Sequence, residues 1–145
     1  MGFLTSLMTE GDISAVAAIE RSSFREPWSE NSLKMLTQHG AFGIVCREGK
    51  TVAAYGGMIC VLDEGQITNI ATLPEYRRRG LAGMTLEAMI EESKRRELAF
   101  LTLEVRESNA AAIALYEKFG FVAIGKRQGF YRFPTEAAII MEKKI

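Results

Sequence analysis

With 145 residues, 18 of them basic and 18 acidic, the chain fits one domain and carries no net charge, so its composition offers no bulk attraction to nucleic acid. Hydrophobic residues make up 48% and charged residues 25%, which is typical of a globular domain and excludes a disordered segment. No apolar run approaches the ~20 residues that cross a bilayer, and no signal peptide is evident at the N-terminus, so we expect a cytoplasmic protein.

The N-terminal part of the chain predicts three strands and two helices. We expect them in this order: a strand at about 2–8, a helix from 13 onward, a helix at 29–38, and strands at 41–47 and 51–62. Gly11-Asp12 can cap the first helix, and Ser29, after the break at Pro27-Trp28, can cap the second. Glu48-Gly49-Lys50 is then the tip of a hairpin, and Gly56-Gly57 is a candidate bulge in its second strand.

The C-terminal part predicts two strand–helix pairs and a closing hairpin. We expect a strand at 65–73, a helix at 80–96, a strand at 100–105, a helix capped by Ser108-Asn109, and strands at 121–126 and 137–143 around a loop at 129–136. The helix at 80–96 has an apolar side, which includes Met84, and a charged, solvated side, which includes Glu92. Gly120 ends the following helix, where the chain needs a left-handed residue. The fold class is therefore a mixed α+β sheet with helices on both faces.

Cysteine and histidine are too few and too scattered for a zinc site. Cys46 and Cys60 lie in separate predicted strands and form no C-x-x-C unit, and His39, the single histidine, lies in a polar turn. We therefore expect no metal and two buried, reduced thiols.

The segment from Arg77 to Gly83 carries the sharpest chemical signal. It follows an apolar run and a proline turn, and it opens the predicted helix at 80–96. The first backbone N–H groups of a helix lack partners within it and carry the positive end of its dipole, which suits a phosphate, while glycine lets the backbone approach closely. Three arginines add charge that a diphosphate can use. The alternative is a solvated basic turn before an ordinary amphipathic helix.

Two better-known phosphate-binding loops do not match the chain. Residues 78–83 lack the G-x-G-x-x-G pattern of dinucleotide sites, and Ile44 stands where a Walker loop ending at Gly49-Lys50-Thr51 has its first glycine. We therefore expect a phosphorylated ligand other than a simple nucleoside triphosphate.

Glu104 and Tyr116 are the candidate groups for proton transfer. Alternation along the strand at 100–105 puts Glu104 on the face opposite Leu103. A carboxylate near the end of a central strand is costly to bury without a partner or a wet cleft, although Arg106, on the same face, could simply pair with it. Tyr116 lies two turns into the next helix, where a tyrosine is either a packing residue or, if it faces a ligand, an acid.

These motifs together resemble those of the GNAT-superfamily N-acetyltransferases, and specifically of the RimI-type ribosomal-protein-alanine N-acetyltransferases. Arg77-x-x-Gly80-x-Ala82 is similar to the superfamily's acetyl-CoA motif, R/Q-x-x-G-x-G/A, with Ala82 as a permitted variant. The RimI-like segments span nearly the whole chain: Pro27-Trp28-Ser29-Glu30, Asn69-Ile70-Ala71, Leu103-Glu104-Val105-Arg106, Ser108 to Tyr116, and Ala138-Ile139-Ile140-Met141. The chain departs from the family between Tyr131 and Ala137, a shorter segment that would wall the acceptor side.

The resemblance implies a GNAT-type acyl-CoA N-acyltransferase fold in a single domain, residues 1–145, with a mostly antiparallel twisted sheet of about seven strands. It also implies acetyl-CoA as cosubstrate. The implied cofactor-binding residues are Ile70, Ala71 and Thr72 along the pantetheine, Arg78, Arg79, Gly80, Leu81, Ala82 and Gly83 around the pyrophosphate, and Asn109 on the CoA arm. Glu104 is the implied general base, acting through water, and Tyr116 is the implied acid that protonates the departing thiolate.

The implied reaction is direct transfer of the acetyl group to the α-amine of an N-terminal alanine of a small-subunit ribosomal protein. An α-amine, with a pKa of ~7.7–8.0, loses its proton far more readily than a lysine amine near ~10.4, so one carboxylate acting through water is enough. The alternatives are a small-molecule amine, another protein N-terminus, or an acyl-CoA-binding module without turnover. The expected partner is then a protein N-terminus, with no direct nucleic-acid or membrane binding, and the protein is expected to be a monomer or a weak homodimer.

Overall fold

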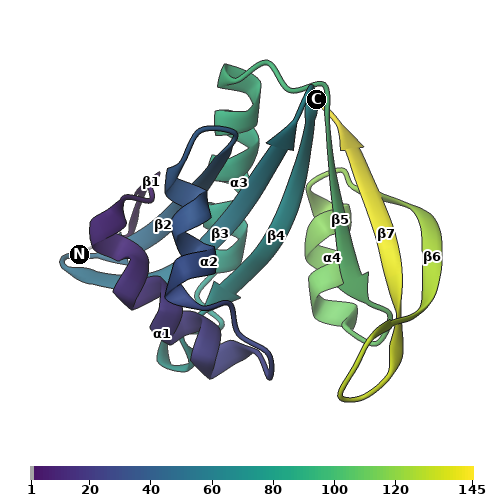
Figure 1. Cartoon of the computed structure of the whole chain (residues 1–145), viewed down its shortest axis with the longest axis horizontal. Coiled ribbons are helices and arrows are strands. Elements are labelled where there is room, and N and C mark those ends of the chain that lie inside the picture. Colours follow the sequence, from purple (N-terminus) through teal and green to yellow (C-terminus); the bar gives the residue numbers. More distant parts are fainter. Residues whose placement is uncertain (1) are drawn as a thin grey trace.

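The computed structural model describes residues 2–145, which form a seven-stranded sheet in the spatial order β1-β2-β3-β4-β5-β7-β6 (Figure 1). Neighbouring strands are antiparallel except for β4 and β5, which are parallel. The strands are β1 (Leu4–Leu7), β2 (Ala41–Glu48), β3 (Thr51–Val61), β4 (Glu64–Thr72), β5 (Phe100–Arg106), β6 (Val122–Tyr131) and β7 (Glu136–Lys144). The predicted mixed, mostly antiparallel sheet is confirmed.

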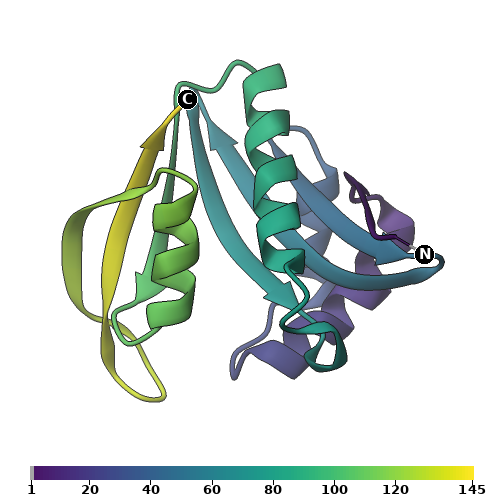
Figure 2. The same ribbon diagram turned by 180° about the vertical axis from the view of Figure 1, so that it is seen from behind.

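Helices cover both faces of this sheet, as predicted. The α-helices are α1 (Ile13–Ser23), α2 (Glu30–Lys34), α3 (Leu81–Arg95) and α4 (Ala110–Lys118), and short 3₁₀ turns are η1 (Glu10–Asp12), η2 (Met35–Thr37) and η3 (Pro74–Tyr76). Figure 1 shows α1 and α2 in front of the sheet, and Figure 2, the view from behind, shows α3 and α4 on the opposite face. Within residues 2–145, no helix has both the length and the apolar character needed to span a membrane.

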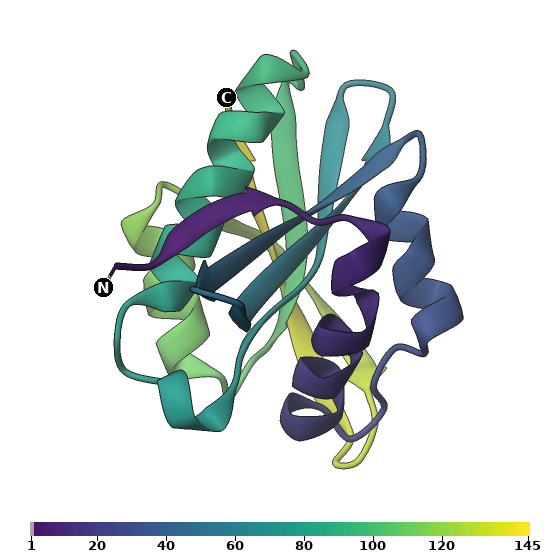
Figure 3. The same cartoon turned by 90° about the vertical axis from the view of Figure 1, so that its left-hand side faces the viewer.

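Each layer of helices buries its own hydrophobic cluster against the sheet. Val16 and Ile19 of α1 are fully buried on one side, and Leu86 and Met89 of α3 are fully buried on the other. Each such aliphatic side chain contributes roughly 1.5–3 kcal/mol to folding when it leaves water. Figure 3, a side view, shows the sheet between the two layers.

The sheet parts between its two central strands. Parallel pairing of β4 with β5 covers only the register from Glu64↔Phe100 to Gln66↔Thr102, and the two strands then diverge (Figure 1). β4 also carries an irregularity against β3, because Gly56 pairs with Ile70 while Met58 pairs with Ile67. The bulge predicted at Gly56-Gly57 therefore lies on the facing strand: Thr68 and Asn69 of β4 together oppose Gly57, and the glycine leaves room for them.

Two predicted elements have different bounds in the structure. The helix predicted at 29–38 is α2 followed by η2, because Leu33 and Leu36 are both buried and the Thr37 hydroxyl donates to the Lys34 carbonyl at 2.8 Å, which tightens the last turn. The closing hairpin is longer than predicted, since Tyr131 pairs with Glu136 and leaves a loop of residues 132–135. Gly120, with a φ of 94°, ends α4 as predicted.

Three expectations from the sequence, two about burial and one about a helix cap, were wrong. Glu92 is buried rather than solvated, because Arg95 and Arg96 donate to its carboxylate at 2.7 and 2.8 Å. Met84 is 38% exposed at the margin of α3. Asp12 stands at the start of α1 without capping it, because its carboxylate accepts from the Thr9 N–H at 2.9 Å and pairs with Arg47.

Candidate active site

The basic loop before α3 has the backbone of an anion-binding turn. Gly80 is the N-cap of α3 with a φ of 77°, and Arg78 has a φ of 66°. The first helical bond runs from the Met84 N–H to the Gly80 carbonyl at 3.1 Å, so the N–H groups of residues 81–83 have no partner within the helix. No atom lies within 4 Å of a Cβ built on Gly80, so the space beside it is open.

The charges of this loop are not neutralised by the protein. Among residues 2–145, no carboxylate forms an ion pair with Arg78 or Arg79, both of which are exposed. The Arg79 guanidinium lies 5.1 Å from the centroid of the Tyr76 ring, and Arg77 donates to the Thr72 carbonyl at 3.3 Å, which holds the loop against the end of β4. Free guanidinium groups beside unpaired backbone N–H groups fit a diphosphate.

Ile70, Ala71 and Thr72 lie at the end of β4 where it has parted from β5. They pair with β3 through Gly56, Tyr55 and Ala54, but the β4–β5 ladder stops at Gln66. The edge of β4 that faces β5 therefore leaves backbone groups free of the ladder next to the basic loop. These groups can bind the amide-rich arm of an acyl carrier.

Gly83 and Asn109 link this region to α4. A Cβ on Gly83 would lie 3.7 Å from the Phe119 ring, so α3 and α4 approach closely there. Asn109 caps α4, and its Oδ1 accepts from the Ala112 N–H at 3.2 Å. The cap uses the side-chain oxygen of Asn109, so the side-chain NH₂ group can donate a hydrogen bond to a ligand.

Glu104 lies exposed on β5 and does not pair with Arg106, contrary to the alternative considered from the sequence. Its Oε2 lies 3.7 Å from Arg127 on β6, and both side chains are exposed, so this contact contributes little. Arg106 instead pairs with Glu136 at 3.2 Å and lies 4.6 Å from the centroid of the Tyr131 ring. Hydrogen bonds from Ser108 and Arg106 hold the pKa of Glu136 below its usual range.

Tyr116 is buried, with 8% of its surface exposed, and packs edge-to-face on Phe121 at a centroid distance of 5.6 Å. Burial raises its pKa to about 12, with the nearby Tyr131 as the second cause. Burial also raises the pKa of Tyr131 to about 12, followed by the repulsion of Glu104. Tyr131 therefore interacts electrostatically with both Glu104 and Tyr116 and is a further candidate site residue. The sequence marked Tyr131 only as the start of the acceptor-side segment, because the β6–β7 hairpin is what brings it to Glu104 and Tyr116.

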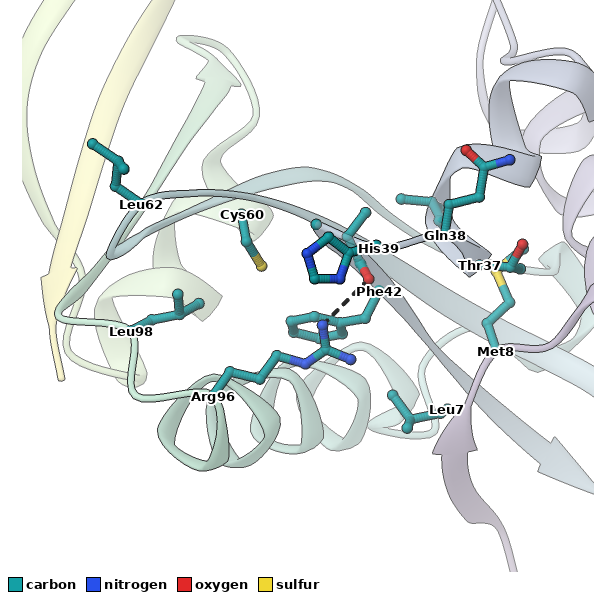
Figure 4. Close-up of a pocket in the computed structure, with 13 residues that line it drawn as sticks. Leu7, Met8, Thr37, Gln38, His39, Phe42, Cys60, Leu62, Arg96 and Leu98 are labelled. Carbon is teal, nitrogen blue, oxygen red and sulfur yellow. Dashed lines mark hydrogen bonds between the residues drawn. The ribbon is translucent and has the colours of Figure 1, made fainter.

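A sizeable hollow lies away from these residues. It measures about 740 Å³ and is lined by His39, Cys60 and Arg96 at the far ends of β3 and α3 (Figure 4). The Arg96 guanidinium stacks over Phe42 at 4.6 Å and already binds Glu92, so its charge is satisfied. None of the candidate site residues lines this hollow. Within residues 2–145, no group of three or more potential ligands from His, Cys, Asp and Glu could hold a metal ion.

The fold and the basic loop together define an acyl-CoA-dependent acyltransferase. The sequence matches the acetyltransferase (GNAT) family over residues 13–121, and the chain belongs to that family. It is 39% identical over 132 residues to the putative [ribosomal protein bS18]-alanine N-acetyltransferase of Bacillus subtilis, covering 90% of this chain and 87% of that protein. It is 40% identical over 145 residues to the [ribosomal protein bS18]-alanine N-acetyltransferase of Escherichia coli K12, covering 97% of this chain and 96% of that protein.

Solved structures agree with this assignment. The crystal structure of the ribosomal-protein-S18-alanine N-acetyltransferase from Escherichia coli superposes with a TM-score of 0.93 at 37% identity, covering 99% of this chain and 94% of that chain. The PaiA N-acetyltransferase of Thermoplasma acidophilum in complex with coenzyme A has a TM-score of 0.82 at 15% identity, covering 100% of both chains. At that identity the second likeness shows the fold alone.

Proposed function

We propose that residues 1–145 form one GNAT N-acetyltransferase domain that transfers the acetyl group of acetyl-CoA to the α-amine of the N-terminal alanine of a ribosomal protein of the bS18 type. The observation that carries this proposal is the 40% identity to the Escherichia coli enzyme over nearly the full length of both chains. A ribosomal-protein substrate places the reaction in the cytoplasm.

The residues around the parted strands would divide the binding of acetyl-CoA between them. The free N–H groups at Leu81, Ala82 and Gly83, with Arg78 and Arg79, would hold the pyrophosphate. The free edge of β4 at residues 70–72 would bind the pantetheine, and Asn109 would donate to the CoA arm. The bound cosubstrate supplies the acetyl group as a thioester.

Glu104 would act as the general base for the acceptor amine. Its carboxylate is open to solvent, and among residues 2–145 Arg127 is its ion-pair partner, so a water molecule can lie between Glu104 and the amine. An α-amine with a pKa of ~7.7–8.0 needs little help to lose its proton near neutral pH, whereas a lysine near ~10.4 carries about 3.4 kcal/mol more deprotonation cost. This difference supports an N-terminal acceptor.

Tyr116 would return a proton on the leaving side. Its hydroxyl is protonated at neutral pH and would give this proton from Oη to the departing sulfur, although burial, which raises its pKa to about 12, makes it a weaker acid than an ordinary tyrosine. The amine would attack the thioester directly, so no covalent bond to the enzyme is required. Glu104 would take the proton of the amine, and Tyr116 would give a proton to the sulfur. Backbone N–H groups of β4 beside the carbonyl would stabilise the charge that develops on its oxygen.

Mass spectrometry of a peptide panel tests the proposal. The panel contains Ala-starting ribosomal N-termini, the same peptides with blocked α-amines, and peptides with an internal lysine. A gain of about 42 Da confined to free Ala α-amines would support both acetyl transfer and the choice of acceptor. Gain on the peptides with a blocked α-amine or an internal lysine would contradict an α-amine acceptor. No gain on any peptide, with CoA still bound, would point to a small-molecule amine or to a binding module without turnover.

A further inference from the structure

Glu20 of α1 is a fully buried carboxylate that the reaction described above does not use. Its surface is 0% exposed. Both carboxylate oxygens accept hydrogen bonds: Oε1 from the Trp28 backbone N–H at 2.8 Å, and Oε2 from the Asn69 amide at 3.0 Å and from the Tyr55 hydroxyl. Among residues 2–145 no lysine or arginine forms an ion pair with it. A carboxylate is expensive to bury in this way unless donors replace its water, and here three donors do so.

The three donors come from three different parts of the fold. Tyr55 lies on β3, Asn69 lies on β4, and Trp28 lies in the connection between α1 and α2. Burial and the Glu20 carboxylate raise the pKa of Tyr55 far above its ordinary value, so its hydroxyl stays a donor. Glu20 therefore joins the α1–α2 connection, through the Trp28 N–H, to side chains of both β3 and β4.

On β4 the partner of Glu20 is Asn69, the residue directly before residues 70–72, which form the proposed pantetheine-binding edge. Asn69 and Thr68 occupy the bulge, where the ladder with β3 skips from Ile67 to Ile70. A Cβ on Gly57 would collide with the Thr68 hydroxyl, so the bulge is accommodated by a glycine on the opposite strand. The hydrogen bond from Asn69 to Glu20 fixes the bulge, and with it the place where residues 70–72 begin.

Glu20 and Glu104 lie on the same face of the sheet. Leu103 belongs to the buried cluster under α3 and α4, so Glu104, its neighbour on β5, points to the opposite face. Tyr55 belongs to the cluster under α1, so Glu20 is bonded on that same opposite face. An amine that reaches Glu104 must approach from the side that α1 and its connection to α2 cover (Figures 1 and 3).

The α1–α2 connection also reaches across to the far side of the parted strands. The Arg25 guanidinium lies 5.8 Å from the centroid of the Phe133 ring in the β6–β7 turn. The segment thus touches the C-terminal hairpin at Arg25 and is anchored to β4 through Trp28 and Glu20. A shift of this segment would change the space between it and Glu104.

We propose that Glu20 is a positioning residue for the acceptor: its three hydrogen bonds set the α1–α2 connection against β4, so that the acceptor amine is held beside residues 70–72 and within reach of Glu104. This inference rests on the proposed function. Glu20 touches neither substrate and acts through Trp28 and Asn69.

The test compares Glu20→Gln with Glu92→Gln. Glutamine keeps the shape of Glu20 but turns one acceptor oxygen into an NH₂ donor that faces the existing donors. Glu92 is a matched control, since it is also a buried carboxylate but lies on α3 with Arg95 and Arg96. Both variants should lower the thermal midpoint. Only Glu20→Gln should raise the KM for the acceptor peptide, with kcat/KM falling about tenfold or more and the dissociation constant of CoA rising by a smaller factor.

Hydrogen exchange provides a readout that does not need turnover. In Glu20→Gln the amides of Trp28 and of residues 70–72 should exchange faster than in the parent, whereas in Glu92→Gln they should not. If the parent acetylates no peptide, the proposed function fails while this measurement still tests Glu20. If Glu20→Gln does not fold, Tyr55→Phe, which removes one donor, should show the same pattern more weakly. Unchanged exchange at these amides, or an acceptor KM within twofold of the parent, would overturn the inference.

Discussion

Replacing Tyr116 with phenylalanine separates a proton-donor role from a packing role. The ring is 8% exposed and packs on Phe121 at 5.6 Å, contacts that phenylalanine keeps. Burial and Tyr131 account for the raised pKa of Tyr116, and no hydrogen bond to the hydroxyl is among the causes. Removing the hydroxyl therefore leaves no buried partner unsatisfied, and we expect the free energy of unfolding to change by no more than about 0.5 kcal/mol.

The expected effect on turnover is much larger. A positioned general acid contributes about 10²–10⁴ in rate, which is roughly 3–5 kcal/mol of the activation barrier. We expect kcat to fall by that factor in Tyr116→Phe. The affinity for CoA should change by less than about twofold, because the proton is needed only in the transition state.

Steady-state acetylation of an Ala-starting peptide and calorimetric titration of CoA measure the two quantities side by side. The pH profile of the parent gives an independent check. With a pKa of about 12, the Tyr116 hydroxyl stays protonated through the physiological range, so kcat should show no alkaline fall from this group until well above its ordinary value of 10.0. A kcat within threefold of the parent, or equal losses in kcat and CoA affinity, would show that Tyr116 is a packing or binding residue.

Three further predictions concern the loop, the base and alkaline stability. Gly80→Val puts a β-branched residue at a φ of 77°, which costs roughly 1–2 kcal/mol or more. The affinity for CoA, measured by calorimetry, should therefore weaken about tenfold. Gly49→Val, at a φ of 58° on a remote hairpin tip, is the control and should leave the affinity for CoA unchanged. Glu104→Gln should reduce kcat/KM for the peptide by about 10²-fold or more, while the affinity for CoA stays intact. A smaller loss of kcat/KM, with no recovery at alkaline pH, would argue against a general base at this position. Tyr116 and Tyr131 have pKa values raised from 10.0 to about 12, so above pH 10 the folded state keeps protons that the unfolded state loses. In urea unfolding, the contribution of these two tyrosines to stability should be constant below pH 10 and should be lost as the pH rises through 12, after an earlier decline from Cys46 and Cys60, whose pKa values burial raises above 9.0. Tyr116→Phe should lessen the decline between pH 10 and 12 by up to about 3 kcal/mol, and an unchanged decline would contradict the raised pKa of Tyr116.

Local patterns were enough to predict most of the elements and the glycine turn that begins α3. Alternation and helical periods depend on near neighbours, so the strands and the long helices were placed to within a few residues. Gly120 was found for the same reason, since a left-handed helix end depends on two or three consecutive residues. Gly56-Gly57 indicated the level of the sheet irregularity but not its strand, because the extra residue belongs to β4.

Interactions between distant parts of the chain could not be predicted in this way. Arg106 was placed beside Glu104 because they are two residues apart on one face, but its partner, Glu136, is 30 residues away on the adjacent strand. The donors to Glu20 include Asn69, which is 49 residues away, and nothing near Glu20 marks it as different from the other charged residues of an amphipathic helix. Glu92 was placed on the exposed side of its helix because arginines three and four residues further on are typical of exposed ion pairs. Its burial follows from the packing of α3 against β2 and β3, which the local sequence does not show.

The short ladder between β4 and β5 leaves the two halves of the sheet joined mainly by side chains. Ile67 of β4 and Leu101 of β5 belong to one buried cluster, which also contains Met58 from β3 and Met141 from β7. Backbone hydrogen bonds hold each half together, but the spacing across the seam is set by the volume of these side chains. Substitutions in this cluster therefore act on the active site from beneath it: a smaller residue at Leu101 would bring the half-sheets closer, and a larger one would spread them. In this fold the geometry of catalysis is adjustable through residues that never touch a substrate.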